Sequence, residues 1–363
     1  METVNISVRQ FTILVIMYTW GSAVLLIPAG LASIAKSNAW ISSLVGLLFG
    51  LVLVLLYMKI AAIYPEKTFV ELNRIVFGRW IGTIISILFL FPIFLLSAGI
   101  LREIGEFFTT QVMIETPIHA IHILTLIVAI YCIRAGLEVI SRTCEIFFPW
   151  TVLFLIVLVI FLLPEMKIEN LQPNFAKGFG PILGAAYPYI SIPYCQLIVF
   201  LMIFPNVNNA PKARKFFFFG VIIASLGITL ITIMCLGVLG DDFTSRNMYP
   251  TYVLGKMVNI GGFIERVEVL VAISWILSTF FKFLVSCYAL LLGMTQILKL
   301  NDMKVLVFPL GFLLLVYSMV SYPNIVYYKE IIYLMWTPYA LTVFFLLPLF
   351  VLTVAIVKTK ISS

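Results

Sequence analysis

The sequence predicts an all-α integral membrane protein of ten transmembrane helices, in which the first and sixth helices are broken near the midplane of the bilayer. The composition predicts the membrane class, because 63% of the 363 residues are hydrophobic and only 11% are charged, which is more apolar surface than a soluble core needs. Long apolar segments predict the helices, since a spanning helix takes about 20 apolar residues. Glycine, serine and proline inside two of these segments predict the breaks.

Ten apolar segments follow one another along the chain, separated by short polar or basic stretches, and each is expected to be one spanning helix. Together they form a single transmembrane domain over residues 1–363, with no cleavable signal peptide expected at its start. The stretch 240–262, which contains Tyr249 and Pro250, is expected to add a short helix. The expected spans are 8–35, 39–63, 80–110, 117–133, 139–163, 178–204, 216–239, 264–298, 305–320 and 331–357.

The first segment contains Gly21, Ser22 and Pro28 in its interior. Glycine and serine are poor helix residues, and proline lacks a backbone donor. Non-helical backbone at mid-membrane depth survives only where it is buried in protein or lines a cavity. We therefore expect the stretch 19–23 to be an interrupted helix whose free N–H and C=O groups face a small ligand. An ordinary glycine at a helix crossing is the alternative.

The sixth segment carries Pro188 and Pro193, with Ser191 between them. Each proline removes a donor and frees a carbonyl one turn earlier, so a second break is expected. Corresponding breaks in two halves of a chain are the pattern of an inverted repeat with a binding site at the midplane. We expect two repeats of five helices, at about 8–163 and 178–357, with two unrelated kinks as the alternative.

Lys282 lies near the centre of the eighth segment, too deep to reach either membrane interface easily. A lone ammonium in hydrocarbon costs at least ~2.5–3.5 kcal/mol, so this side chain is expected to face the bundle interior and find acceptors there. A structural ion pair with a carboxylate elsewhere in the bundle is the alternative. Arg102 and Glu106 are spaced i,i+4 towards the outer end of the third segment, and they are expected to form a solvated vestibule pair.

The charge pattern and the cysteines exclude several classes of function. The formal net charge of +7 suits anionic membrane lipid and gives no argument for nucleic acid. Lys and Arg are more frequent on the side that holds both chain ends, so the N- and C-termini are expected in the cytoplasm. The five cysteines show no paired spacing, and no nucleophile–base arrangement, phosphate loop or metal cluster appears. Neither enzyme activity nor a cofactor or metal is expected.

Motifs in several segments resemble those of a known family. The stretch 21–28, Gly-Ser-Ala-Val-Leu-Leu-Ile-Pro, resembles the first-helix motif of the amino acid–polyamine–organocation transporters, which usually has a second glycine where this chain has Ala23. More specifically, the whole chain resembles the B subunit of bacterial spore germinant receptors, the spore permease family within that superfamily. The residues that carry this resemblance are 191–194 (Ser-Ile-Pro-Tyr), 201–205 (Leu-Met-Ile-Phe-Pro), 263–268 (Phe-Ile-Glu-Arg-Val-Glu) and Trp275.

The resemblance implies a fold like that of the bacterial leucine transporter, in a nutrient sensor of the inner spore membrane. It implies an A subunit and a lipoprotein C subunit as partners. It also implies germinants that are typically amino acids, with sugars or nucleosides for some receptors. Cys195 and Gln196 depart from the family pattern, which often has Gly-Glu here. The missing carboxylate favours an apolar amino acid.

A free amino acid carries a carboxylate and an ammonium, and the two breaks can supply partners for both. A half-helix that restarts offers free N–H groups and a partial positive end, so the backbone of 21–23 is expected to meet the carboxylate and the carbonyls of 187–190 the ammonium. By analogy with sodium-coupled relatives of the fold, Lys282 is expected to take the place of the coupling cation. The expected ligand-binding residues are Thr19, Gly21, Ser22, Ala23, Leu96, Ser97, Tyr187, Tyr189, Ile190, Ser191, Pro193 and Ser286.

The expected function is nutrient sensing by a receptor subunit, and a secondary amino acid transporter is the alternative. A receptor subunit that senses a nutrient needs only a ligand that binds two states with different affinity. A secondary amino acid transporter would use the same site, and a fold by itself does not separate the two. For each side chain of the expected pocket, ordinary packing is the alternative role.

Overall fold

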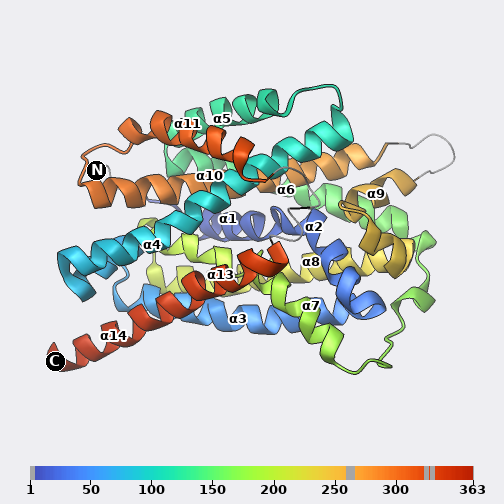
Figure 1. Cartoon of the computed structure of the whole chain (residues 1–363), viewed down its shortest axis with the longest axis horizontal. Helices are drawn as coiled ribbons and strands as arrows, with labels where there is room; N and C mark the ends of the chain where they lie inside the picture. The colour runs from blue at the N-terminus through green and yellow to red at the C-terminus, as the bar shows by residue number, and fades with distance from the viewer. Residues whose placement is uncertain (1–4, 259–265, 323–326, 328–331, 363) are drawn as a thin grey trace.

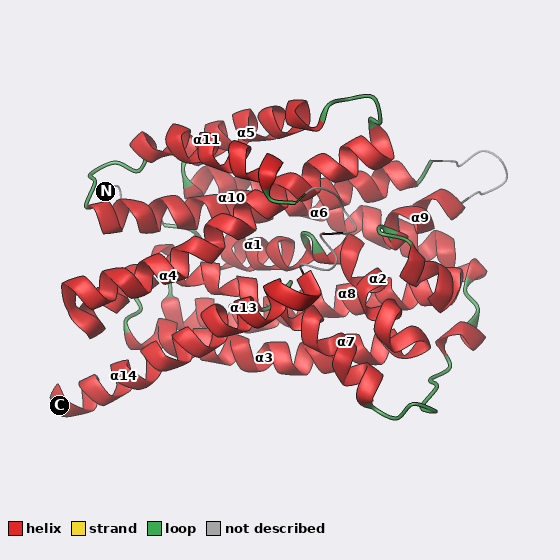
Figure 2. Ribbon diagram, viewed as in Figure 1, coloured by secondary structure: helices red, strands yellow, loops and turns green. Residues whose placement is uncertain are grey.

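Long helices that lie side by side make up almost the whole structure (Figure 1 and Figure 2). The structure is a computed structural model, and it describes residues 5–258, 266–322, 327 and 332–362. Within those ranges the chain forms no β-strand, and its only extended pairing is an isolated bridge between Ile6 and Val207.

The helices follow the apolar segments of the sequence in order. Short 3-10 or π-helical turns join several of them, including Cys195–Met202 after α7 and Ile332–Trp336 before α13. The α-helices are α1 (Val8–Trp20), α2 (Ala23–Ala35), α3 (Ala39–Ile63), α4 (Phe69–Phe107), α5 (Ile118–Ala135), α6 (Leu137–Leu162), α7 (Gly180–Ser191), α8 (Ala210–Arg246), α9 (Pro250–Met257), α10 (Glu268–Leu298), α11 (Lys304–Val320), α13 (Thr337–Leu341) and α14 (Leu347–Ser362).

Eight helical stretches of the described chain are long and apolar enough to cross a membrane, and α11 is a shorter apolar helix. Large apolar side chains stand on their outer faces, such as Trp80 at 79% and Val320 at 78% exposure, as a surface against lipid requires. The total of ten spans stays a prediction. The expected starts of the eighth and tenth spans, at Ile264 and Ile331, and the motif residue Glu265 lie outside the described residues.

Two helices extend further than the hydrophobic pattern predicts. Helix α4 begins at Phe69, eleven residues before the expected start of its span at position 80, because Thr68 and Glu71 form a reciprocal capping box at its N-terminus. The basic stretch is therefore helical up to Gly78, where a φ of 78° turns the chain. Helix α8 likewise includes a break at Gly240 (φ 77°). Helix α9 confirms the short helix expected after Tyr249.

The first and sixth segments lie in the interior of the bundle. In α1, Phe11 and every residue from Ile13 to Trp20 are buried. In Gly180–Met202, 89% of the most hydrophobic 18 residues are buried, whereas the same share is 22–61% in the other seven helical stretches that are long enough to cross a membrane. Helix α1 packs against α6, α8 and α10, and α7 packs against α2 and α3. Both segments are therefore shielded from lipid, which is the condition under which a membrane helix can be interrupted.

The chain start ties these two interior segments together at the end of the bundle where the N-terminus lies. The Ile6 N–H donates to the Asn206 carbonyl at 2.9 Å, and the Asn208 N–H donates to the Ile6 carbonyl at 3.0 Å. Just beyond, the Phe11 ring packs against Phe200 and Phe204, with ring centroids 5.5 and 5.0 Å apart. These contacts fix the position of α1 relative to the chain that follows α7.

The packing of α3 against α7 and the turn that follows it depends on two glycines and gives the first testable prediction. A Cβ on Gly46 would lie 2.1 Å from Cδ1 of Tyr189, and a Cβ on Gly50 would lie 2.4 Å from Cγ of Tyr194. Overpacking of this kind costs roughly 1–3 kcal/mol. We expect Gly46→Ala and Gly50→Ala each to lower the thermal midpoint of the detergent-purified chain. Gly180→Ala is the control, since nothing lies within 4 Å of its added Cβ, and equal melting of all three variants would contradict this packing.

Candidate functional site

The chain is not helical between α1 and α2. Helix α1 ends at Trp20, and Gly21 has φ 0° and ψ −116°. Ser22 precedes the first residue of α2, Ala23, and its side chain makes no capping hydrogen bond to the helix. The first N–H groups of a helix have no acceptor within it, and they give that end a partial positive charge. The start of α2 thus presents polar backbone in the interior of the bundle.

Helix α7 ends at Ser191, and the chain continues through a turn into the 3-10 stretch Cys195–Met202. The carbonyls at this end already accept local hydrogen bonds. The Pro188 carbonyl accepts from the Ser191 hydroxyl at 2.8 Å. The Tyr189 carbonyl accepts from the N–H group three residues later at 3.4 Å, and the Ile190 carbonyl accepts from the N–H group four residues later at 3.3 Å. One lone pair of each of these carbonyls is therefore used inside the turn.

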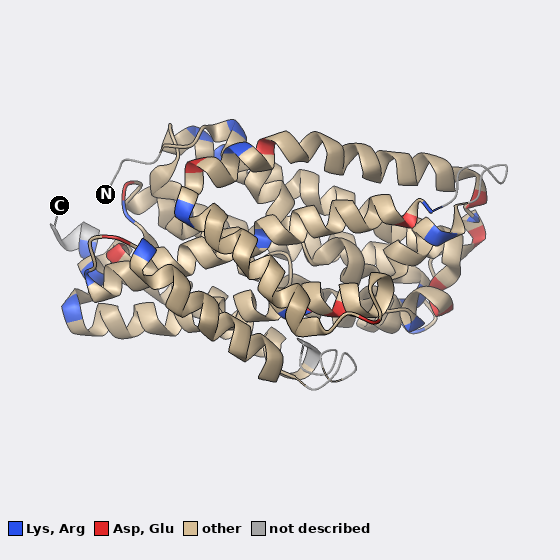
Figure 3. Cartoon of the chain, turned by 90° about the horizontal axis from the view of Figure 1, so that it is seen from above, with Lys and Arg blue, Asp and Glu red and all other residues tan. Residues whose placement is uncertain are grey.

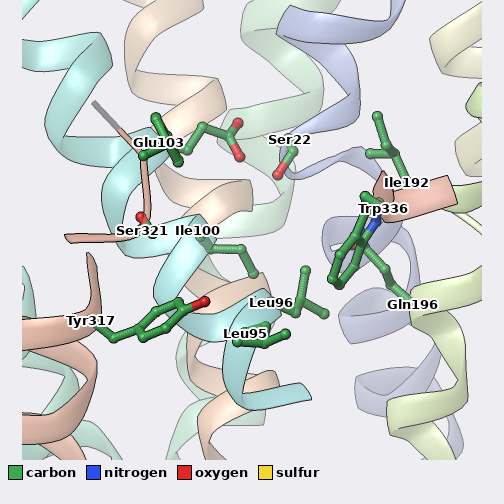
Figure 4. Close-up of a pocket in the computed structure, with 12 residues that line it drawn as sticks. Ser22, Leu95, Leu96, Ile100, Glu103, Ile192, Gln196, Tyr317, Ser321 and Trp336 are labelled. Carbon is green, nitrogen blue, oxygen red and sulfur yellow. The ribbon is translucent and has the colours of Figure 1, made fainter. Parts of the chain in front are cut away.

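A small cavity of about 210 Å³ lies beside the α1–α2 junction. Figure 4 shows its lining, with Ser22 and Glu103 along one side and Gln196 and Trp336 on another. Most of the remaining wall is apolar. The lining residues are Ser22, Leu95, Leu96, Gly99, Ile100, Glu103, Ile192, Gln196, Tyr317, Ser321, Tyr322 and Trp336.

Lys282 reaches the α1–α2 junction from α10. Its side chain is 1% exposed, and Nζ donates to the Ser22 hydroxyl at 3.3 Å. The ammonium also lies 5.6 Å from the ring centroid of Tyr18, within cation–π range. A Cβ on Gly21 would lie only 2.6 Å from Cδ of Lys282. The lysine stem can pass this point only because residue 21 has no side chain.

Glu103 completes a chain of polar groups through Ser22. The Glu103 carboxylate is directed towards Ser22 (Figure 4) and interacts electrostatically with Ser22 and with Lys282. Glu103 is 3% exposed. Its Oε1 atom has no hydrogen-bond partner among the described residues. The ammonium of Lys282 and the carboxylate of Glu103 thus face the same hydroxyl in a buried site.

The pair Arg102–Glu106 is not the solvated vestibule pair that the sequence predicts. Nε of Arg102 lies 3.0 Å from Oε1 of Glu106, and the two side chains are only 11% and 7% exposed. The Tyr322 ring covers the guanidinium at 5.1 Å, and its hydroxyl donates to the Glu106 carboxylate at 3.5 Å.

In the loop before α9, burial and the nearby charges of Glu103 and Glu106 raise the pKa of the Tyr249 phenol, which stays neutral.

The structure places only two of the expected ligand-binding side chains in the lining of the cavity. These are Ser22 and Leu96. Gly21 and Ala23 flank Ser22 at the junction. Ile190 and Pro193 lie at the end of α7, next to the lining residue Ile192.

Five other expected residues are buried but bond to neighbouring protein groups. The Thr19 and Ser97 hydroxyls donate to carbonyls one turn back in their own helices, at 2.8 Å each. Ser286 lies 3.2 Å from the Tyr18 hydroxyl, and the Tyr189 hydroxyl lies 3.2 Å from that of Tyr194. Ser191 lies 3.1 Å from Thr337. Helix α10 therefore contacts the α1–α2 junction through Ser286 and Lys282, but it does not line the cavity as expected.

Tyr187 differs most from its expected place. Its side chain is 43% exposed, because position 187 falls on the outer face of α7. Sequence reasoning also missed Trp336 and Tyr317, which reach the cavity from the last third of the chain. Glu103 could have been found, since 96, 99, 100 and 103 follow the i, i+3, i+4, i+7 spacing of one helix face.

Two solved transporters have the same fold along nearly the whole chain. MhsT in complex with L-phenylalanine superposes with a TM-score of 0.70 and 12% identity, covering 95% of this chain and 97% of that one. Mhp1, a nucleobase-cation-symport-1 family transporter in a closed conformation with bromovinylhydantoin bound, superposes with a TM-score of 0.69 and 11% identity, covering 93% and 75%. At such identities the likeness concerns the fold alone, and it is the leucine-transporter-like fold that the resemblance implies.

Sequence relatives identify the family. A family model described as spore germination protein matches residues 5–326. Spore germination protein KB of Bacillus subtilis (strain 168) is 29% identical over 327 residues, covering 89% of this chain and 87% of that protein. Spore germination protein YndE of the same organism is 31% identical over 301 residues, covering 82% of each.

The match covers most of the chain, and the helices carry the lipid-facing apolar side chains of a multi-pass membrane protein. The motifs of the sixth segment lie in the matched range, and Ile192 of the first of them lines the cavity. The protein therefore belongs to the spore germination protein family of B subunits, which are non-enzymatic membrane proteins with a transporter-like fold.

Proposed function

We propose that this chain is the nutrient-sensing subunit of a spore germination receptor and that it binds a small germinant, an amino acid, in the cavity beside the α1–α2 junction. The observation that carries the proposal is the cavity itself, which combines the buried polar side chains Ser22, Glu103 and Gln196 with an otherwise mostly apolar wall. Such a lining suits a small molecule with a polar end and an apolar body.

Several features support an amino acid as the ligand. The start of α2 supplies N–H groups and a partial positive end for a carboxylate. A related fold, that of MhsT, was solved with L-phenylalanine bound. We propose that Ser22, Leu96 and the backbone of Gly21 and Ala23 contact the ligand. The other expected residues, Thr19, Ser97, Tyr187, Tyr189, Ile190, Ser191, Pro193 and Ser286, are proposed to shape or support the two breaks.

The proposed setting of the chain follows from its family. It spans the inner spore membrane ten times, in repeats at about 8–163 and 178–357, with both termini on the spore core side. The two ends of the chain lie at one end of the bundle, together with many Lys and Arg residues (Figure 3), which supports this orientation. Ligand binding biases an equilibrium between two arrangements of the bundle, and the A and C subunits respond to the change.

We further propose that Lys282 takes the place of a coupling cation at the junction. The supporting observation is the burial of its ammonium against Ser22 and over the Tyr18 ring. A tethered charge would make ligand binding independent of sodium or link it to protons.

A ligand screen tests the proposed function directly. The purified full-length chain should melt at a higher temperature in the presence of one or more common L-amino acids. A ligand that binds only the folded state stabilises that state, and the stabilisation grows with the logarithm of the ligand concentration divided by Kd. The measurement is a thermal-shift titration with amino acids, sugars and nucleosides. A chain that no amino acid stabilises would contradict amino acid sensing.

Variants of Lys282 test the cation role. Lys282→Ala should abolish ligand stabilisation, because it removes the charge beside Ser22, whereas Lys282→Arg keeps a charge and should retain part of the response. Thermal-shift titration of both variants measures this, and the melting temperature without ligand reports folding. Wild-type ligand response in the alanine variant, or a dependence of wild-type binding on sodium, would refute the role.

The alternative function is a secondary amino acid transporter, which the fold shared with MhsT and Mhp1 favours. Uptake into proteoliposomes separates the two functions. A sensing subunit should bind labelled amino acid stoichiometrically without accumulating it. Accumulation over many turnovers, driven by a sodium or proton gradient, would show transport, and empty liposomes provide the control.

A further inference from the structure

Two of the residues that line the cavity carry an acceptor atom without a partner in the described part of the chain. Oε1 of Glu103 and Oε1 of Gln196 are buried and have no hydrogen-bond partner within the described ranges of the chain, and both side chains are only 3% exposed. Buried polar groups in folded proteins almost always have partners. Two unpartnered oxygen atoms on residues that line one small cavity therefore indicate a bound molecule that completes their hydrogen bonding.

The two groups approach the cavity from different helices. Glu103 comes from α4 and Gln196 from the stretch after α7, with Ser22 between them (Figure 4). A glutamine amide can offer either an acceptor or a donor by turning about its last bond. An ionised carboxylate only accepts. Glu103 therefore sets the chemistry of the ligand, and its free oxygen calls for a donor.

The surrounding charges favour a cationic donor. Among the described charged groups near the cavity, Arg102 and Glu106 form an ion pair with each other at 3.0 Å. Lys282 donates to Ser22, and no direct ion pair within 4.0 Å joins it to Glu103 in the described chain. Glu103 thus lacks a contacting counter-charge. A cation in the cavity would provide one, whereas an anion without an amine would meet like charge in a buried site.

The cation that fits is organic and monovalent. Within the described residues, no three His, Cys, Asp or Glu side chains cluster in a way that could hold a metal ion. The rest of the lining includes Leu95, Leu96 and Ile100 from α4 and the ring of Trp336, which are contacts for hydrocarbon. A protonated amine carried on a small apolar body matches both parts of the cavity.

We infer that the Glu103 carboxylate binds the ammonium group of the ligand, so that the site takes small primary amines with an apolar body and rejects the same body without its amine. This inference rests on the proposed binding of an amino acid at this cavity. It replaces the carbonyls of 187–190 as the expected ammonium partners, since three of those carbonyls accept hydrogen bonds within their own turn.

Wild-type chain and paired probes test the inference without any substitution. The probes are L-alanine, L-leucine and L-phenylalanine, each compared with the acid that lacks the amine: propionate, 4-methylpentanoate and 3-phenylpropionate. Calorimetric titration of the purified full-length chain should give at least about tenfold tighter binding for the best amino acid than for its matched acid. Equal affinity within a pair would overturn the assignment.

Substitution of Glu103 tests the same contact from the protein side. Glu103→Gln should weaken the best amino acid at least about tenfold and leave its matched acid unchanged or tighter; Glu103→Asp should retain part of the affinity. Glu106→Gln is the matched control, because it removes an equal charge one turn away on α4 and outside the lining. The melting temperature without probe reports folding of each variant.

Three results would overturn the inference. An equal loss in Glu103→Gln and Glu106→Gln would show a general charge effect in place of a contact. Binding of glucose or inosine, with no binding of any amino acid, would remove the ammonium assignment and leave nutrient sensing in place. Failure of the wild-type chain to bind any of these probes would overturn both the assignment and the proposed site.

Discussion

The interaction on which the site depends is the passage of the Lys282 side chain over the backbone at Gly21. A Cβ at that position would lie 2.6 Å from the lysine stem, so the lysine can follow this path only beside a glycine. Burying an ammonium in a membrane protein is costly unless acceptors surround it. Here the helix is interrupted at the same point, and the interruption places the Ser22 hydroxyl 3.3 Å from Nζ. The break and the buried charge therefore stabilise one another.

This arrangement determines what the neighbouring groups can do. Lys282 approaches from α10 and Glu103 from α4, and both face the Ser22 hydroxyl. Among the described residues, neither charge has an ion-pair partner within 4.0 Å, and this leaves the carboxylate available to a ligand. The second interrupted segment contributes Ile192 and Gln196 to the opposite wall. The Ile6–Val207 bridge holds the two interrupted segments together at the end near the N-terminus.

Part of this site could be predicted from the sequence, because its causes are local. Glycine and serine within an apolar segment predict the interruption at 21–22. A lysine far from either end of its apolar segment must face the interior of the helix bundle, whichever helices its own helix packs against. The burial of Glu103 could not be predicted in the same way. It depends on how α4 packs against α10, α11 and α5, and no pattern within residues 80–110 specifies that packing. The burial of the Arg102–Glu106 pair has the same origin.

The cavity-lining residues from distant segments of the chain could not be predicted from the sequence either. Trp336 and Tyr317 line the cavity because α11 and the chain before α13 pack beside α4 and the end of α7, and no local pattern specifies that packing. Tyr187 and Ser286 show the reverse error. Their segments do approach the junction. However, Tyr187 lies on the outer face of α7, and Ser286 lies 3.2 Å from the Tyr18 hydroxyl instead of facing the cavity.

A cryo-electron microscopy map of the full-length chain with a bound amino acid tests the central claim most directly. The account predicts a helix interrupted at Gly21 and Ser22, with ligand density between Ser22 and Glu103 and the amine end at the carboxylate. A continuous helix through residues 18–26, or ligand density at a site that Lys282 and Glu103 do not border, would contradict it.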